Sequence, residues 1–108
     1  MGSKASKTCA HDAVFYNNPN ALRLLKQNGC SLDKTDRLGF TPLHLACMLK
    51  PDQEYLRLRL ECLDILLDAG CDQLKKDPNG LIPLMLALQN QFTEAADMIY
   101  SRLPPEED

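Results

Sequence analysis

The feature that most limits how this chain can fold is an internal repeat with a period of 41 residues. Gly29-Cys30 recurs as Gly70-Cys71, and segment 36–43 (DRLGFTPL) recurs as segment 77–84 (DPNGLIPL). Because the matches fall in two separate parts of the unit, chance similarity is a poor explanation. A repeat of this length is one small unit that buries its apolar face against its neighbours, so the pattern predicts a stack of such units.

The first half of each unit carries the signals of a tight turn followed by a short helix. An Asp-x-x-Gly sequence, as in Asp36 to Gly39, favours a turn because Asp bonds its own backbone and Gly accepts positive φ. Thr41 then fits an N-cap, and Pro42 fits the first helical position, where its missing N–H costs nothing. We therefore expect a short helix that ends at about Leu49.

The second half carries the signals of a longer helix. Its apolar residues fall at i, i+4, i+7 and i+11 and form one stripe: Leu56, Leu60, Leu63 and Leu67. Pro51 and the acids that follow it favour a helix start, and Gly70 fits the C-cap. The sequence therefore predicts a helix over residues 52–68.

Two of these segments resemble the ankyrin repeat. Residues 39–46 (GFTPLHLA) are similar to the ankyrin signature, and residues 66–71 (LLDAGC) are similar to the end of its second helix. The resemblance implies an all-α ankyrin-repeat solenoid of helix-turn-helix units. Its parts would be a tail at residues 1–7, a repeat domain at 8–103 with repeats at about 8–35, 36–76 and 77–103, and an acidic tail at 104–108.

The central repeat is longer than the family period. Ankyrin repeats have 33 residues, so this repeat carries about eight extra residues before its second helix, enough to lengthen that helix by about 12 Å. Three apolar side chains would lie on this extension: Tyr55, Leu56 and Leu58. They would either fold back on the stack or offer an apolar contact to a partner.

The outer repeats are degenerate copies of the central one. In the first repeat, Thr8 and His11 stand 33 residues before Thr41 and His44. In the third repeat, Ile82 and Met85 replace that Thr-His pair. Terminal repeats of a solenoid need polar outer faces, and four residues fit that expectation: Asp12, Glu94, Asp97 and Arg102.

Charge and composition narrow the function classes. The net charge is −3, with +3 over residues 1–35 and −6 over residues 36–108, which argues against a nucleic-acid binder. Apolar stretches are too short for a membrane span, and the first residues lack the apolar block of a secretory signal. Five cysteines without a C-x-x-C pair favour a reduced, cytoplasmic protein.

No set of residues has the spacing of a catalytic, cofactor or metal site. The ankyrin resemblance implies that His44 is structural, bonding the Thr41 hydroxyl and tying neighbouring turns together. Four cysteines fall where ankyrins place small core residues: Cys30, Cys47, Cys62 and Cys71. We expect no enzyme activity and no cofactor, and a cysteine-based metal or redox protein stays as an alternative.

The N-terminus matches the M-G-x-x-x-[ST] pattern for N-myristoylation, with Gly2 as the acylated residue. Lys7 and Cys9 could supply the second signal that stable membrane binding needs. A chance match or a vector-derived start would give the same residues. If Gly2 is acylated, the protein would be a membrane-tethered regulator at the cytoplasmic face of a membrane.

The function that the resemblance implies is protein–protein binding, as a small cytoplasmic adaptor or regulator that is a monomer outside its complex. Ankyrin proteins bind through their turn tips and the exposed side of their first helices. Carried over to this chain, the partner-binding residues are Phe15, Tyr16, Arg37, Leu38, Phe40, Met48, Leu49, Pro78, Asn79, Leu81, Gln89 and Asn90. This set predicts an apolar strip on the first two repeats and a polar end on the third.

Overall fold

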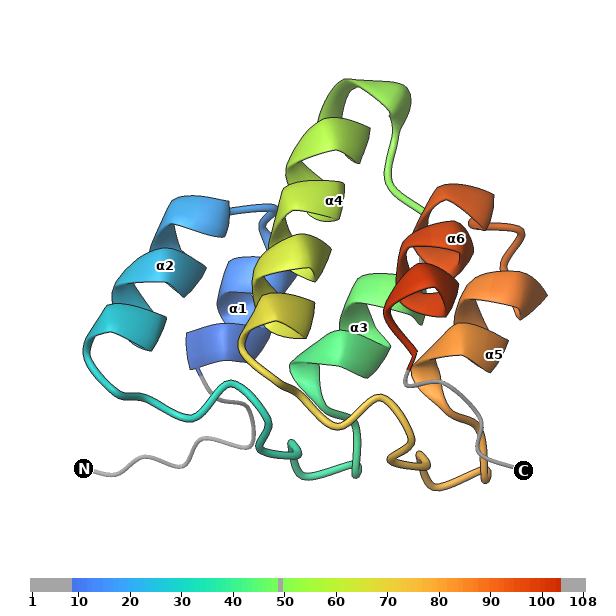
Figure 1. Cartoon of the computed structure of the whole chain (residues 1–108), viewed down its shortest axis with the longest axis horizontal. Coiled ribbons are helices and arrows are strands. Elements are labelled where there is room, and N and C mark those ends of the chain that lie inside the picture. The colour runs from blue at the N-terminus through green and yellow to red at the C-terminus, as the bar shows by residue number, and fades with distance from the viewer. Residues whose placement is uncertain (1–8, 49, 104–108) are drawn as a thin grey trace.

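The computed structural model describes residues 9–48 and 50–103, and this part of the chain consists of six helices joined by turns. The helices are α1 (Cys9–Phe15), α2 (Pro19–Gln27), α3 (Pro42–Met48), α4 (Gln53–Asp68), α5 (Pro83–Gln89) and α6 (Thr93–Arg102). Each consecutive pair packs as a hairpin, and the hairpins stack so that α3 lies between α1 and α5, and α4 between α2 and α6 (Figure 1). This confirms the predicted all-α solenoid.

The helix starts follow the predicted capping chemistry. The Thr41 hydroxyl accepts the backbone N–H of His44 at 3.2 Å, and Pro42 is the first residue of α3. In repeat one, the Asn18 side chain accepts the N–H of Ala21 at 3.2 Å, ahead of Pro19. The expected end of α3 at Leu49 lies outside the described residues, where α3 is followed only as far as Met48.

The second helices of repeats one and two end in the same way. Gly29 and Gly70 have φ values of +76° and +83°, in the region that favours glycine. The next residue, Cys30 or Cys71, donates its N–H back to a carbonyl in the last turn of the helix, at 3.0 and 3.3 Å respectively. Ala69 is therefore the C-cap of α4, and Gly70 follows it as the left-handed residue that stops the helix.

The two Asp-x-x-Gly turns are built alike. The Asp36 carboxylate accepts the N–H groups of Leu38 and Phe40, and the Asp77 carboxylate accepts those of Asn79 and Leu81, all within 3.0 Å. Gly39 and Gly80 both have positive φ. The turns also touch: a Cβ on Gly39 would lie 2.9 Å from Pro78 Cγ, so this position needs glycine for space as well as for conformation.

The extra residues of repeat two lengthen α4 as predicted. It has 16 residues, compared with 9 in α2 and 10 in α6, and its first turns extend past both neighbours at the top of Figure 1. Of the apolar residues on the extension, Leu56 packs partly against the core, whereas Tyr55 and Leu58 are exposed. The extension therefore both folds back and offers apolar surface.

A buried arginine, which the sequence analysis did not predict, holds this extension in place. Arg59 is only 7% exposed. Its Nε donates to the Asn17 side chain at 2.7 Å, and its Nη1 donates to the Ala46 carbonyl at 3.4 Å. Asn17 follows the end of α1 and Ala46 lies in the last turn of α3, so the guanidinium joins the C-terminal ends of two first helices, where a positive charge is favourable.

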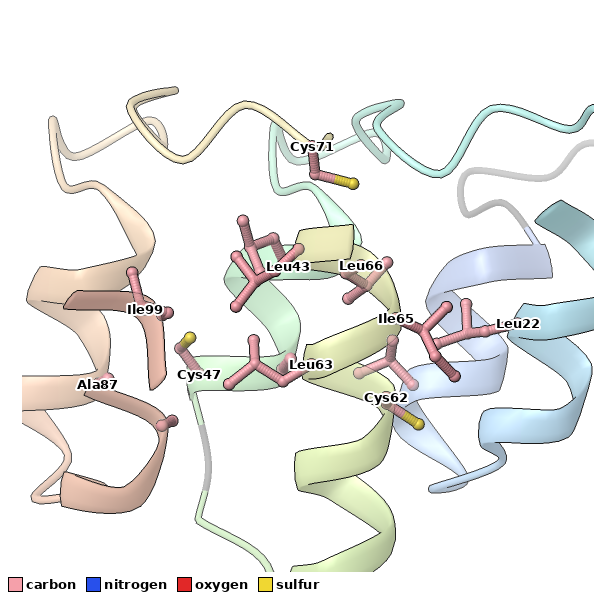
Figure 2. Close-up of a cluster of buried hydrophobic side chains, with 14 of the residues drawn as sticks. Leu22, Leu43, Cys47, Cys62, Leu63, Ile65, Leu66, Cys71, Ala87 and Ile99 are labelled. Carbon is pink, nitrogen blue, oxygen red and sulfur yellow. The ribbon is translucent and has the colours of Figure 1, made fainter. Parts of the chain in front are cut away.

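The core runs the length of the stack through α4. Leu63 and Leu66 are fully buried, and Figure 2 shows Ile65 directed towards Leu22 of repeat one. Cys47 points the other way, towards the repeat that carries Ala87 and Ile99. Each repeat thus buries one side against the repeat before it and one side against the repeat after it.

The outer faces of the stack differ from the polar caps that the sequence predicts. Leu24 is 59% exposed at one end, and Leu88 and Tyr100 are 59% and 72% exposed at the other. Arg102 and Glu94 turn inward to repeat two, where Arg102 pairs with Asp64 and Glu94 pairs with Lys50. Asp12 and Asp97 are exposed as expected, but they share the end faces with these large apolar side chains.

Cys30 also departs from its expected place in the core. Its counterpart Cys71 is buried, with its thiol 3.4 Å from the Leu32 carbonyl of the preceding repeat. No described segment lies in the corresponding place beside Cys30, so this thiol is exposed.

Candidate partner-binding surface

Two histidines fix the turns relative to the first helices. His11 Nε2 lies 2.7 Å from the Phe40 carbonyl, and His44 Nε2 lies 3.2 Å from the Leu81 carbonyl. Phe40 and Leu81 occupy the same position in successive repeats, so each histidine reaches from its own helix to the next turn. The predicted structural role of His44 is confirmed, and His11 repeats it in the degenerate first unit.

The hydrogen bonds of His44 define its protonation state. A carbonyl oxygen can only accept, so Nε2 must carry the proton that points at Leu81. Nδ1 then accepts from Thr41, whose N–H lies at 3.2 Å and whose hydroxyl lies at 2.8 Å. Burial lowers the pKa of His44 below its ordinary value, although the Leu81 carbonyl and Asp77 oppose that shift. The folded protein therefore favours neutral His44.

We expect the free energy of unfolding to fall as the pH drops below about 6.5, the ordinary pKa of histidine. The unfolded chain protonates His44 there, whereas the fold resists protonation until the pH reaches the lowered pKa. Stability is thus fully present above that window and declines through it. Urea unfolding of wild type and His44→Gln between about pH 7.5 and pH 5.5 checks this. Equal pH slopes in the two proteins would contradict it.

Most of the predicted contact residues reach solvent. Leu38 is 68% exposed on its turn and Tyr16 is 71% exposed at the end of α1, where its ring lies 5.0 Å from that of Phe15. Six others are exposed: Phe15, Arg37, Pro78, Asn79, Gln89 and Asn90. Three are half-buried: Phe40, Met48 and Leu81. Leu49 and the acylation candidate Gly2 lie outside the described residues.

The half-buried members have structural duties that explain their place. The Phe40 ring meets the ring of His44 edge to face at 6.1 Å, and Met48 and Leu81 pack against the core. A substitution at these residues would disturb the fold as well as the surface. Leu38 and Tyr16 are therefore the cleaner probes of binding.

The structure adds an apolar residue that the sequence analysis left out. Met85 is exposed on α5, at the position that His44 holds in α3. The third repeat is thus less polar than Gln89 and Asn90 alone suggest. The loss of histidine at this position was the available signal, because a side chain with no next turn to bond has no reason to be polar.

The cysteines form two groups. Cys9 and Cys30 are exposed, whereas Cys47, Cys62 and Cys71 are buried. Burial raises the pKa of these three thiols to about 12, 11 and 12 respectively, so they stay protonated and unreactive. Within residues 9–48 and 50–103, no three His, Cys, Asp or Glu side chains gather in a way that could hold a metal ion.

This grouping predicts the outcome of a thiol titration. Two thiols should react quickly with an aromatic disulfide reagent in the native protein, and three more should react only after denaturant is added. Cys9→Ser and Cys30→Ser should each remove one fast equivalent. Fast reaction of four or five thiols in the folded protein would revive the redox alternative.

Helical hairpins stacked in register, with Asp-x-x-Gly turns along one edge and a Thr-His pair tying turn to turn, define a repeat solenoid that presents turns and first helices. A family profile for three copies of the ankyrin repeat matches residues 2–77. The chain therefore belongs to the ankyrin-repeat family, whose repeats are protein-interaction modules and generally not enzymes.

Curated relatives agree. The chain is 38% identical over 82 residues to ankyrin repeat and SOCS box protein 6 of Mus musculus, a match that covers 75% of this chain and 18% of the relative. The Homo sapiens form is 37% identical over the same shares. Inversin of Mus musculus is 39% identical over 80 residues, 73% of this chain and 7% of the relative. The chain thus spans less than a fifth of the length of these relatives.

None of the described helices is long and apolar enough to cross a membrane.

Proposed function

We propose that this protein is a non-enzymatic adaptor or regulator in the cytoplasm that binds a partner protein through its turn tips and first helices. The observation that carries the proposal is the exposed apolar set of Phe15, Tyr16 and Leu38, held on a surface whose turns are fixed by His11 and His44. Exposed apolar surface of this kind marks interaction sites, and aromatic residues are enriched among those that dominate binding energy.

The test compares two leucines of similar exposure on different faces. Wild type, Leu38→Ala and Leu24→Ala would be used to capture proteins from cells, with quantitative mass spectrometry as the measurement. A partner of the proposed surface is lost with Leu38→Ala and kept with Leu24→Ala. With that partner purified, Leu38→Ala or Tyr16→Ala should weaken binding about tenfold or more, at an unchanged melting temperature. Equal binding by all variants would reject the surface.

A second candidate function rests on the N-terminal sequence. The M-G-x-x-x-[ST] motif supports a regulator tethered to a membrane through myristoylated Gly2, with Lys4 and Lys7 as a small basic supplement. Metabolic labelling of the untagged protein with a myristate analogue should tag wild type and spare Gly2→Ala. Absence of label in cells with active acylation would remove this candidate and leave the protein-binding proposal untouched.

A further inference from the structure

The outer face of α5 and α6 has the residues of an internal packing face but lacks its cover. Leu84 and Leu88 stand 41 residues after Leu43 and Cys47. Leu43 and Cys47 are fully buried, whereas Leu84 is half-buried and Leu88 is largely exposed. Figure 2 shows Cys47 directed towards the third repeat, so Leu88 points to where a further helical hairpin would stack. Tyr100 adds a large exposed ring to this face.

The outer face of α1 and α2 is the opposite half of the same interface. Leu24 stands 41 residues before Ile65, which is buried and directed towards Leu22 of the preceding repeat. Leu24 is largely exposed because no described hairpin precedes α1. Beside it is a hollow of about 390 Å³ whose apolar lining includes Tyr16, Ala21 and Leu25. This face can therefore receive protruding apolar side chains.

We propose that the outer face of α5 and α6 docks on the outer face of α1 and α2 of a second copy of this chain. Leu88 and Tyr100 of one molecule then pack against Leu24 and the hollow of the next. The contact continues the interface that already joins the repeats within each molecule. The monomer that the sequence predicts is thus the dilute form, and association grows with concentration.

Charge selects this head-to-tail arrangement over a two-fold dimer. The described part of repeat one, residues 9–35, has three basic and two acidic residues, whereas repeat three, residues 77–103, has one basic and three acidic. Unlike ends attract and like ends repel. Met85 replaces histidine on the docking side, so the contact is apolar and needs no turn carbonyl from the second copy. Because such a contact is heterologous, it adds molecules in a row without closing.

The test uses two variants that each block one face. Leu24→Asp blocks only the receiving face, and Leu88→Asp blocks only the docking face; both side chains are exposed, so the fold should be kept, as melting curves would verify. Sedimentation velocity would be run from about 1 µM to about 1 mM, a range that covers weak association. Wild type should form dimers and longer rows, and each variant alone should stay monomeric.

The mixture of the two variants is the decisive sample. Each retains the face that the other has lost, so an equimolar mixture should form a one-to-one dimer and nothing larger. Added salt should weaken that dimer, because the ends carry opposite charge. Wild type that stays monomeric throughout would overturn the proposal and leave these faces to a different partner. A dimer that forms in either variant alone would also overturn it, in favour of a two-fold contact. Tyr100→Asp provides a second docking-face variant should Leu88→Asp unfold.

Discussion

Leu66→Ala should lower the free energy of unfolding by about 2–5 kcal/mol, the usual cost of removing a large aliphatic side chain from a closed core. Leu66 is fully buried on α4, the helix that contacts both neighbouring second helices. In a stack, each repeat contacts only its neighbours, so a cavity at this residue weakens the link to both sides. A loss of this size is a large part of the stability of a small domain, about 5–15 kcal/mol in all.

The matched control for this prediction is Leu58→Ala, on the exposed side of the same helix. Both variants lose the same atoms from the same backbone context, but Leu58 leaves no closed cavity. Urea unfolding should show a change of about 0.5 kcal/mol or less for Leu58→Ala. Equal midpoints for wild type and Leu66→Ala would contradict the packing described for α4.

Asn17→Gly should cost about 1–3 kcal/mol, because it removes the side-chain oxygen that accepts the buried Arg59 Nε–H. Asn17 has φ +55°, a conformation that glycine adopts at least as readily, so the backbone is not strained by the change. The loss therefore reports the hydrogen bond to the guanidinium. At about 4–8 °C per kcal/mol for a domain near this size, thermal unfolding resolves it.

Gln91→Gly separates the side chain from the backbone in that experiment. Gln91 follows α5 as Asn17 follows α1, and its φ is +58°. It carries the same gain in chain flexibility, whereas the Arg59 Nε–H is donated to Asn17. We expect its effect on melting temperature to be small, so the difference between the two variants isolates the Arg59 contact. If both variants shift equally, Arg59 does not depend on Asn17.

Local chemistry explains why the sequence predicted so much of this fold. The Asp36 turn, the Thr41 cap and the Gly70 helix end are each built from residues a few positions apart. Their residue preferences follow from backbone geometry alone. The repeat then carried these local assignments from one unit to the next.

Arg59 shows where such reasoning stops. It stands 41 residues after Asn18 and 33 before Phe92, which are the N-caps of α2 and α6. The insertion moves the start of α4 forward, so the same position falls inside a helix and against the ends of α1 and α3. An arginine in a helical stripe is usually exposed. Its burial depends on two segments distant in sequence, which no local pattern contains.

The candidate surface was predicted in outline for a similar reason. The position of a residue in the repeat indicates the side of the stack on which it lies, and Leu38 and Tyr16 are exposed there as expected. How far a rim residue sinks depends on its neighbours. Phe40 is half-buried because its ring meets His44, and Leu88 is exposed because no described hairpin covers it.

The histidine contacts also bear on the entropy of partner binding. His11 and His44 fix successive turns to the helices before them, and Gly39 lets the two turns meet at Pro78. The spacing of the turn tips is therefore set before any partner arrives. A surface that loses little conformational freedom on binding keeps more of its contact energy as affinity. Selectivity then follows from the same rigidity, since a partner whose contacts are spaced differently finds no turn that can move to meet it.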